Sequence, residues 1–181
     1  NTSNNEVAIG TLGDDSIYIF SFSSETGLGT YTYKLPKELF STLASLSDPV
    51  DMAFTNDGTH LFVLSYYGKA LIQLDKDIQS GSYTPVSAIK SGTNNIQGFN
   101  YPQRFVIVPN SNFILITANG TGDGISIIQF GTLHTLQWLG YFSYVDEPFG
   151  LIKPTALFWD PISQSGVVGS NGEKSLIIIS K

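Results

Sequence analysis

The chain has 181 residues, of which 41% are hydrophobic and only 13% are charged. Nine Lys and Arg against fifteen Asp and Glu give a net charge of −6, and no basic run concentrates positive charge, which argues against a nucleic-acid partner. Cysteine is absent, which excludes a disulfide framework, a thiolate nucleophile and a cysteine zinc site.

The first segment predicts three β-strands at Glu6–Thr11, Ser16–Phe22 and Thr30–Leu35, because β-branched and aromatic runs alternate with Gly-rich and Asp-rich turns. Residues 36–44 begin with Pro36 and have apolar residues at helical spacing, so one or two helical turns are expected there.

A longer pattern begins at Asp48–Asp75, where three strand-length runs are separated by turn residues, and it recurs downstream. Pro49, Pro102 and Pro154 each open an apolar run, and they lie 53 and 52 residues apart. The second and third strands follow at matching offsets. The period of the repeat is therefore about 53 residues.

The third strands, such as Ile125–Phe130 and Ser175–Ser180, are apolar at consecutive positions, which predicts burial on both faces. Fourth strands at Tyr83–Ile89 and Thr135–Phe142 contain Pro85 and Gly140, which is typical of edge strands. Stacked four-stranded antiparallel units predict an all-β protein built as a β-propeller. An irregular β-sandwich is the alternative.

Residues 49–63 resemble the blade core of the YVTN, lactonase-like and NHL-like propellers, with a proline, an apolar run, an Asp-Gly turn and a valine-containing strand. The resemblance implies an architecture shared by lactonases, redox enzymes, binding scaffolds and surface-layer proteins.

Four blades are predicted in a single domain, at residues 1–47, 48–100, 101–152 and 153–181. The first lacks its innermost strand and the last lacks its outermost strand. The chain is thus expected to be a small propeller with two reduced blades, an excerpt of a larger ring, or an array completed by another chain.

Residues at the start of inner strands, and in the turns between second and third strands, should gather on one face of a propeller. These binding candidates are Asp48, Asp51, Tyr66, Tyr67, Tyr101, Arg104 and Lys153. The carboxylates of Asp48, Asp51 and Asp123 could bind Ca²⁺ through oxygen; the alternative for them is ordinary turn and capping chemistry, with no cofactor.

A long loop adds four further binding candidates: Tyr144, Asp146, Glu147 and Phe149. The two histidines do not favour a Ser-His-Asp hydrolase: His60 is expected to face solvent beside the Asp-Gly turn, and His134 to lie on the outer part of a blade.

Three functional hypotheses follow. The first is a non-enzymatic module that presents loops and sheet edges to protein partners or to itself. The second is a metal-dependent enzyme of the lactonase type, and the third is glycan binding by exposed aromatic residues. The polar, weakly charged composition predicts an extracellular, cell-surface or periplasmic location, and no apolar run approaches the roughly 20 residues of a membrane helix.

Overall fold

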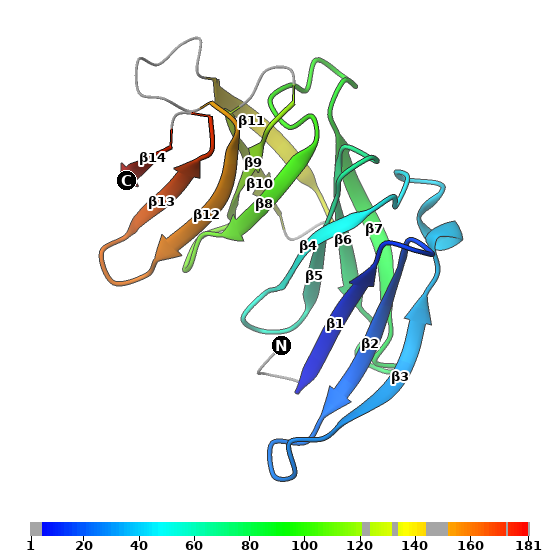
Figure 1. Ribbon diagram of the computed structural model, residues 1–181. Coiled ribbons are helices and arrows are strands. Elements are labelled where there is room, and N and C mark those ends of the chain that lie inside the picture. The colour runs from blue at the N-terminus through cyan, green and yellow to red at the C-terminus, as the bar shows by residue number, and fades with distance from the viewer. Residues whose placement is uncertain (1–4, 121–123, 132–133, 144–151, 173, 181) are drawn as a thin grey trace. The chain divides into compact units, whose positions relative to one another are not determined.

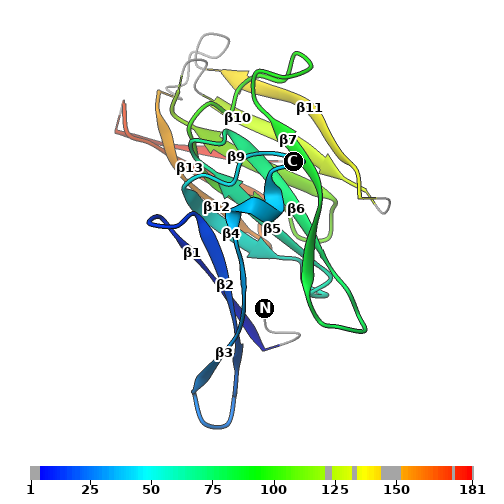
Figure 2. The ribbon, with the colours of Figure 1, turned by 90° about the vertical axis from the view of Figure 1, so that its right-hand side faces the viewer.

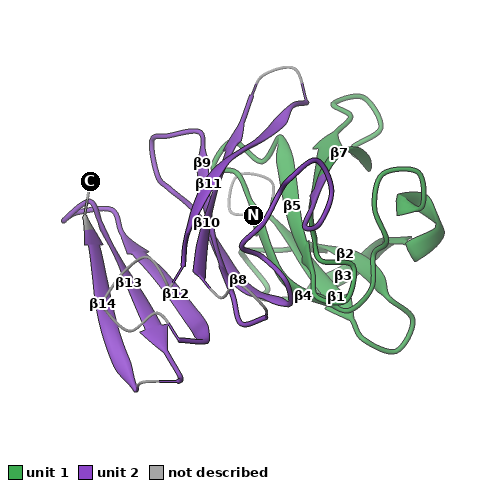
Figure 3. Cartoon of the chain, turned by 90° about the horizontal axis from the view of Figure 1, so that it is seen from above, with its two compact units in different colours: residues 1–88 green, residues 89–181 purple. Residues whose placement is uncertain are grey.

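The computed structural model describes residues 5–120, 124–131, 134–143, 152–172 and 174–180. The chain divides into two compact units, residues 1–88 and 89–181, which have separate colours in Figure 3. Within the described ranges, four antiparallel sheets contain 14 strands (Figure 1). No helix in these ranges has the length and apolar character needed to cross a membrane.

The first unit contains a three-stranded sheet of order β1-β2-β3 and a four-stranded sheet of order β4-β5-β6-β7. The strands are β1 (Glu6–Thr11), β2 (Ser16–Phe22), β3 (Gly29–Leu35), β4 (Pro49–Phe54), β5 (His60–Ser65), β6 (Ala70–Lys76) and β7 (Tyr83–Lys90). A short 3-10 helix, η1 (Lys37–Phe40), lies between β3 and β4, as the spacing after Pro36 predicts (Figure 2).

Apolar residues of both sheets form the core of this unit. Ile17 and Ile19 of β2 are fully buried in one cluster with Leu61 of β5 and Leu74 of β6. Strand β5 is buried from Leu61 to Ser65, and β6 is buried from Ala70 to Leu74.

A network of polar side chains joins the two sheets of the first unit, linking β1 with β6 and β7, and β7 with β3. The Glu6 Oε1 atom accepts a hydrogen bond from Lys76 Nζ at 2.7 Å, and Glu6 Oε2 accepts one from the Tyr83 hydroxyl at 3.0 Å. The side chains of Glu6 and Lys76 are only 13% and 17% exposed. The Tyr83 backbone N–H in turn donates to the Tyr33 hydroxyl at 3.0 Å, which ties β7 to β3.

The second unit contains a four-stranded sheet of order β11-β10-β9-β8 and a three-stranded sheet of order β12-β13-β14. The strands are β8 (Pro102–Ile107), β9 (Phe113–Ala118), β10 (Gly124–Phe130), β11 (Leu136–Ser143), β12 (Pro154–Asp160), β13 (Ser165–Ser170) and β14 (Ser175–Ser180). Leu115, Ile125, Trp159 and Val168 pack together between these sheets.

These sheets confirm the all-β fold and its repeat. Pro49, Pro102 and Pro154 are the first residues of β4, β8 and β12, which occupy the same place in their sheets. Strands β7 and β11 lie at sheet edges, as Pro85 and Gly140 predict. Among the described strands, the first sheet has no counterpart of β4 and the last has no counterpart of β7. That the 181 residues form a single domain, and that its four blades have the ranges given above, stays a prediction.

The prediction that third strands are covered on both faces holds for β10 but is wrong for β14. Ile177 and Ile179 pack into the core of the second unit, whereas Leu176 and Ile178 are 77% and 72% exposed. Successive strand residues point to opposite faces, so an apolar run buries both faces only if a layer covers each of them. In the described part of the second unit, a layer covers the face of β14 that carries Ile177 and Ile179, and the face that carries Leu176 and Ile178 is exposed.

The turn between β4 and β5 makes the stability of the fold depend on acidity. Asp57 Oδ1 accepts hydrogen bonds from Thr55 Oγ1 at 2.6 Å and from the N–H and hydroxyl of Thr59 at 3.1 and 2.8 Å. These bonds, the Thr55 bond first, lower the pKa of Asp57 below its ordinary value of 3.8. The ionised carboxylate therefore stabilises the folded state above about pH 4, and this contribution is lost as the pH falls through 3.8 toward the folded pKa.

We expect Asp57→Asn to reduce the acid sensitivity of the melting temperature. The substitution keeps an acceptor oxygen and removes the titration, and the group is exposed, so the effect is a few tenths of a kcal/mol, about 1 °C. Thermal unfolding followed by circular dichroism at pH 5 and pH 3 measures the difference. Identical pH dependence in the wild type and the variant would contradict this assignment.

Candidate functional site

The start of each inner strand has the same unusual backbone geometry. The residue before the proline adopts a positive φ in three sheets, at Asp48 (60°), Tyr101 (51°) and Lys153 (53°). A register shift follows at the first residues of β4, β8 and β12. Non-glycine residues rarely occupy this left-handed region, and such conformations are frequent at functional sites.

Backbone hydrogen bonds fasten the turn between the second and third strands to these same residues. The carbonyl oxygens of Asp48, Tyr101 and Lys153 accept from the following N–H groups: Tyr66 at 2.9 Å, Asn119 at 3.4 Å and Asn171 at 3.1 Å. The residue before Tyr101 and the residue before Lys153 are bound as well. The Gly120 N–H donates to the Asn100 carbonyl oxygen, and the Gly172 N–H donates to the Ile152 carbonyl oxygen. Each of the three sheets therefore presents a rigid edge of turn plus inner-strand start.

In the first unit, this edge holds Asp48, Asp51, Tyr66 and Tyr67. The Asp48 N–H donates to Asp15 Oδ1 at 2.8 Å, and Asp51 Oδ1 accepts from the Met52 N–H at 3.0 Å. The rings of Tyr66 and Tyr67 meet edge to face, with centroids 4.9 Å apart, and Tyr67 is 65% exposed. The edge offers two half-buried carboxylates beside an exposed aromatic ring.

In the second unit, the equivalent edges hold Tyr101, Arg104 and Lys153. Strands β8 and β12 are neighbours, so these residues lie on adjacent inner strands (Figures 1 and 3). Arg104 and Lys153 are exposed, and one Arg104 nitrogen, Nη1, donates to the Gln103 carbonyl at 2.9 Å. This edge carries positive charge where the edge in the first unit carries negative charge.

Several predicted site residues cannot be placed. Asp123 and the loop residues Tyr144, Asp146, Glu147 and Phe149 lie outside the described residues. Across the ranges that the structure covers, no group of three His, Cys, Asp or Glu side chains could hold a metal ion. A calcium site that combines Asp48 and Asp51 with Asp123 therefore stays a prediction.

The prediction that His60 faces solvent is wrong. Its side chain is 24% exposed, and Nδ1 lies 2.7 Å from Asp75 Oδ1, which also accepts from Gln73 Nε2 at 2.9 Å. His60 and Asp75 are directly paired across β5 and β6, and this register is the signal that could have found the contact. The side chains of His60, Gln73 and Asp75 form a cluster at the start of β5. Ser65, at the other end of β5, pairs with Pro49, so the cluster lies away from the edge that holds Asp48.

Comparison of the chain with known proteins finds a family that is built from the same kind of repeated blade. The chain matches the lactonase family of seven-bladed β-propellers over residues 1–147. No curated protein matches the chain in sequence.

Solved structures show the same fold. A proposed 6-phosphogluconolactonase from Bacteroides uniformis has a TM-score of 0.77 at 14% identity, over 98% of this chain and 47% of that one. The same type of protein from Bacteroides fragilis gives 0.74 at 18% identity, over 98% and 48%. The periplasmic gluconolactonase of Pseudomonas aeruginosa gives 0.72 at 11% identity, over 98% and 47%.

The chain thus spans about half the length of these structures, and identities this low show a common fold only. The four sheets, the period and the family match agree on one architecture, a partial propeller. The chain belongs to the lactonase family of seven-bladed β-propellers.

Proposed function

We propose that the protein is part of a propeller that hydrolyses the lactone of a sugar acid. The observation that carries this proposal is the family match over residues 1–147. It is supported by the solved relatives described as lactonases of gluconic acid or its 6-phosphate. The location that the composition predicts also agrees with one of them, which is described as periplasmic.

The inner-strand edges supply groups suited to this reaction. Water adds to the lactone carbonyl, the ring C–O bond breaks, the ring oxygen leaves as a hydroxyl group, and the new acid loses a proton. The carboxylates of Asp48 and Asp51 are the candidates for activating the water, directly or through a bound calcium ion. In the second unit, Arg104 and Lys153 form a separate candidate set, suited to binding an anionic group of the substrate such as a phosphate.

Proton release at constant pH tests this proposal. The protein is purified from its source, so that any polypeptide completing the ring is retained, and is given gluconolactone or its 6-phosphate, with calcium or with a chelator. We expect hydrolysis above the spontaneous rate. Arg104→Ala should lower kcat/KM for the 6-phosphate at least about tenfold, because a charge-assisted hydrogen bond is worth about 1.5–3 kcal/mol.

The matched control is Lys90→Ala, which removes a positive charge from the exposed end of the edge strand β7 and should leave kcat/KM unchanged. Asp48→Asn and Asp51→Asn test the carboxylates, and their effect should depend on calcium if the metal takes part. If neither lactone is hydrolysed above the spontaneous rate under any metal condition, the proposal fails.

A second candidate function is protein binding through the terminal sheet, which is favoured by a different observation. Phe158, Leu176 and Ile178 on one face of the β12-β13-β14 sheet are 63%, 77% and 72% exposed. The pairings of Phe158 with Val167 and of Val167 with Ile178 make the patch continuous across the three strands, a form suited to another blade-like sheet. Light scattering should show association that Phe158→Ser with Ile178→Ser abolishes, and a monomeric wild type would contradict this function.

Glycan binding by exposed aromatic rings, such as that of Tyr67, is a third hypothesis. A glycan array that gives no signal would contradict it.

A further inference from the structure

The side chain of Gln73 in β6 is fully buried, and its hydrogen bonding is incomplete. The Nε2 atom donates to Asp75 Oδ1 at 2.9 Å, but no donor in the described ranges reaches the Oε1 atom. The indole nitrogens of Trp138 and Trp159 are buried in the same condition, but those are donors, whereas Gln73 Oε1 is an acceptor. Because an unpaired buried acceptor destabilises the folded state, this oxygen indicates a ligand that brings a donor or a positive charge.

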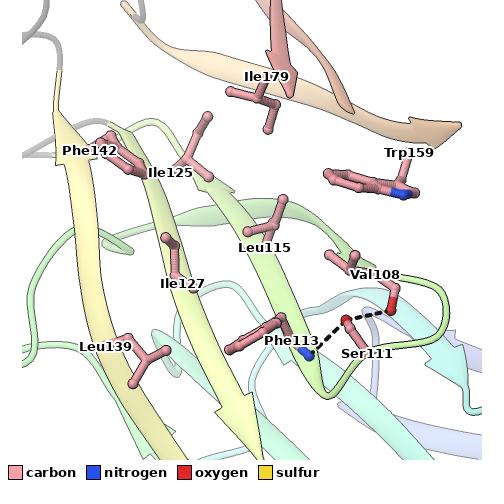
Figure 4. Close-up of a pocket in the computed structure, with 10 residues that line it drawn as sticks. All are labelled: Val108, Ser111, Phe113, Leu115, Ile125, Ile127, Leu139, Phe142, Trp159 and Ile179. Atoms are coloured by element: carbon pink, nitrogen blue, oxygen red, sulfur yellow. Dashed lines mark hydrogen bonds between the residues drawn. The ribbon is translucent and has the colours of Figure 1, made fainter. Parts of the chain in front are cut away.

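Hydroxyl groups in apolar surroundings elsewhere in the chain have hydrogen-bond partners. In the open apolar cavity of the second unit, which Figure 4 shows, the hydroxyl of Ser111 donates to the Val108 carbonyl at 2.7 Å and accepts from the Phe113 N–H at 3.2 Å. In the first unit, the buried Ser65 hydroxyl donates to the Ser47 carbonyl at 2.8 Å and accepts from the Ser47 N–H at 2.9 Å. The unpaired amide oxygen differs from both of these groups.

The Gln73 amide forms a compact triangle with His60 and Asp75, which are paired across β5 and β6. His60 Nδ1 lies 2.7 Å from Asp75 Oδ1, and Gln73 Nε2 lies 2.9 Å from Asp75 Oδ1 and 3.5 Å from His60 Nδ1. Rotation of the amide about its last bond brings Oε1 to the place of Nε2, so that a nitrogen and two oxygens converge. Bonds from Zn²⁺ to nitrogen and oxygen are about 2.0–2.2 Å long, which places neighbouring donors about 3–3.5 Å apart. The three donors are therefore spaced much as on one face of the coordination shell of such an ion.

We propose that His60, Gln73 and Asp75 form a binding site for a divalent transition-metal ion such as Zn²⁺. The ion would bind His60 Nδ1, Asp75 Oδ1 and Gln73 Oε1, and the imidazole ring would carry its proton on Nε2. The side chains of His60 and Asp75 are 24% and 16% exposed, so the ion and its remaining water ligands reach the donors from that side.

This site differs in chemistry from the calcium site predicted at the edge that holds Asp48 and Asp51. Calcium and magnesium take oxygen ligands, whereas an imidazole nitrogen favours zinc, cobalt, nickel or copper. The inference does not depend on lactone hydrolysis.

Titration of the protein with Zn²⁺ after removal of bound metal by a chelator tests the site. We expect isothermal titration calorimetry to show one ion per chain, with a dissociation constant in the micromolar range or tighter. Co²⁺ should bind with a visible absorption band that Zn²⁺ abolishes and that an equal concentration of Ca²⁺ leaves unchanged. Displacement of Co²⁺ by Ca²⁺ would contradict the donor set.

A matched pair of carboxylate variants locates the binding. Asp75→Asn should weaken Zn²⁺ binding at least about tenfold, as should His60→Ala, because each removes a ligand. Asp77→Asn is the control: Asp77 lies just beyond β6, where its Oδ1 accepts from the N–H groups of Gln79 at 2.8 Å and Ser80 at 2.7 Å. It should leave binding unchanged, and thermal unfolding verifies that the variants fold.

Gln73→Glu distinguishes a metal ligand from a residue that only supports the fold. A second carboxylate beside Asp75 should lower the melting temperature of the metal-free protein, because two like charges share a buried place. It should also tighten Zn²⁺ binding at least about tenfold, so that Zn²⁺ raises the melting temperature more than in the wild type. A purely structural role would give the destabilisation without rescue by Zn²⁺. The absence of binding at millimolar Zn²⁺, or binding that is unaffected by His60→Ala and Asp75→Asn, would overturn the proposal.

Discussion

Replacing Glu6 with methionine is expected to lower the free energy of unfolding by about 3 kcal/mol. The carboxylate of Glu6 accepts hydrogen bonds from Lys76 Nζ and from the Tyr83 hydroxyl, and both charged side chains are more than four-fifths buried. Removing one partner of such a pair leaves the other charge in a poorly solvated place, which typically costs 3–5 kcal/mol. The loss should be measured by urea unfolding.

The companion substitution Lys76→Met separates the charge effect from a packing effect. A methionine in each position keeps the side-chain volume and removes both charges, so Glu6→Met with Lys76→Met should be more stable than either single variant. A double variant that is as unstable as the sum of the two singles would show that the ion pair is not what stabilises the junction of β1 with β6 and β7.

The strand positions could be predicted because they depend on local residue types. The predicted bounds of β1, β2 and β14 coincide with the observed ones, and each inner strand begins at its proline. Burial could not be predicted in the same way. The run of isoleucines in β14 is apolar on both faces, but whether a face is covered depends on a neighbouring layer, which no residue of the run encodes.

The geometry of the candidate site also could not be predicted from the sequence. A following proline ordinarily drives a residue toward extended backbone, yet Asp48, Tyr101 and Lys153 all have positive φ. Their side chains share no chemical property, so only their common place in the repeat connects them. The contact of His60 with Asp75 likewise depends on the register of two strands rather than on either residue alone.

The rigidity of the site edge in the first unit depends on Gly68, and Gly68→Ala is expected to lower the free energy of unfolding by about 1–3 kcal/mol. A Cβ atom at this position would overlap the Ser45 carbonyl oxygen and the Ser65 hydroxyl. That hydroxyl is buried, donates toward the carbonyls of Ser45 (3.1 Å) and Ser47 (2.8 Å), and accepts from the Ser47 N–H (2.9 Å). Because the Ser45 carbonyl oxygen is a backbone atom, it cannot move away without displacing the chain. The overlap with the added Cβ atom should therefore cost about 1–3 kcal/mol.

Gly13→Ala is the matched control, because a Cβ atom at Gly13 meets no atom within 4 Å. It should change the stability by less than about 0.5 kcal/mol. Urea unfolding compares the two variants, and the near-ultraviolet circular dichroism of the adjoining Tyr66 and Tyr67 rings reports on the edge itself. Because Ser47 directly precedes Asp48, displacement of this segment should also disturb the left-handed residue at the site. Equal stability of the two variants would mean that the turn can move away from Ser45 at little cost, and that Asp48 is not held rigidly by it.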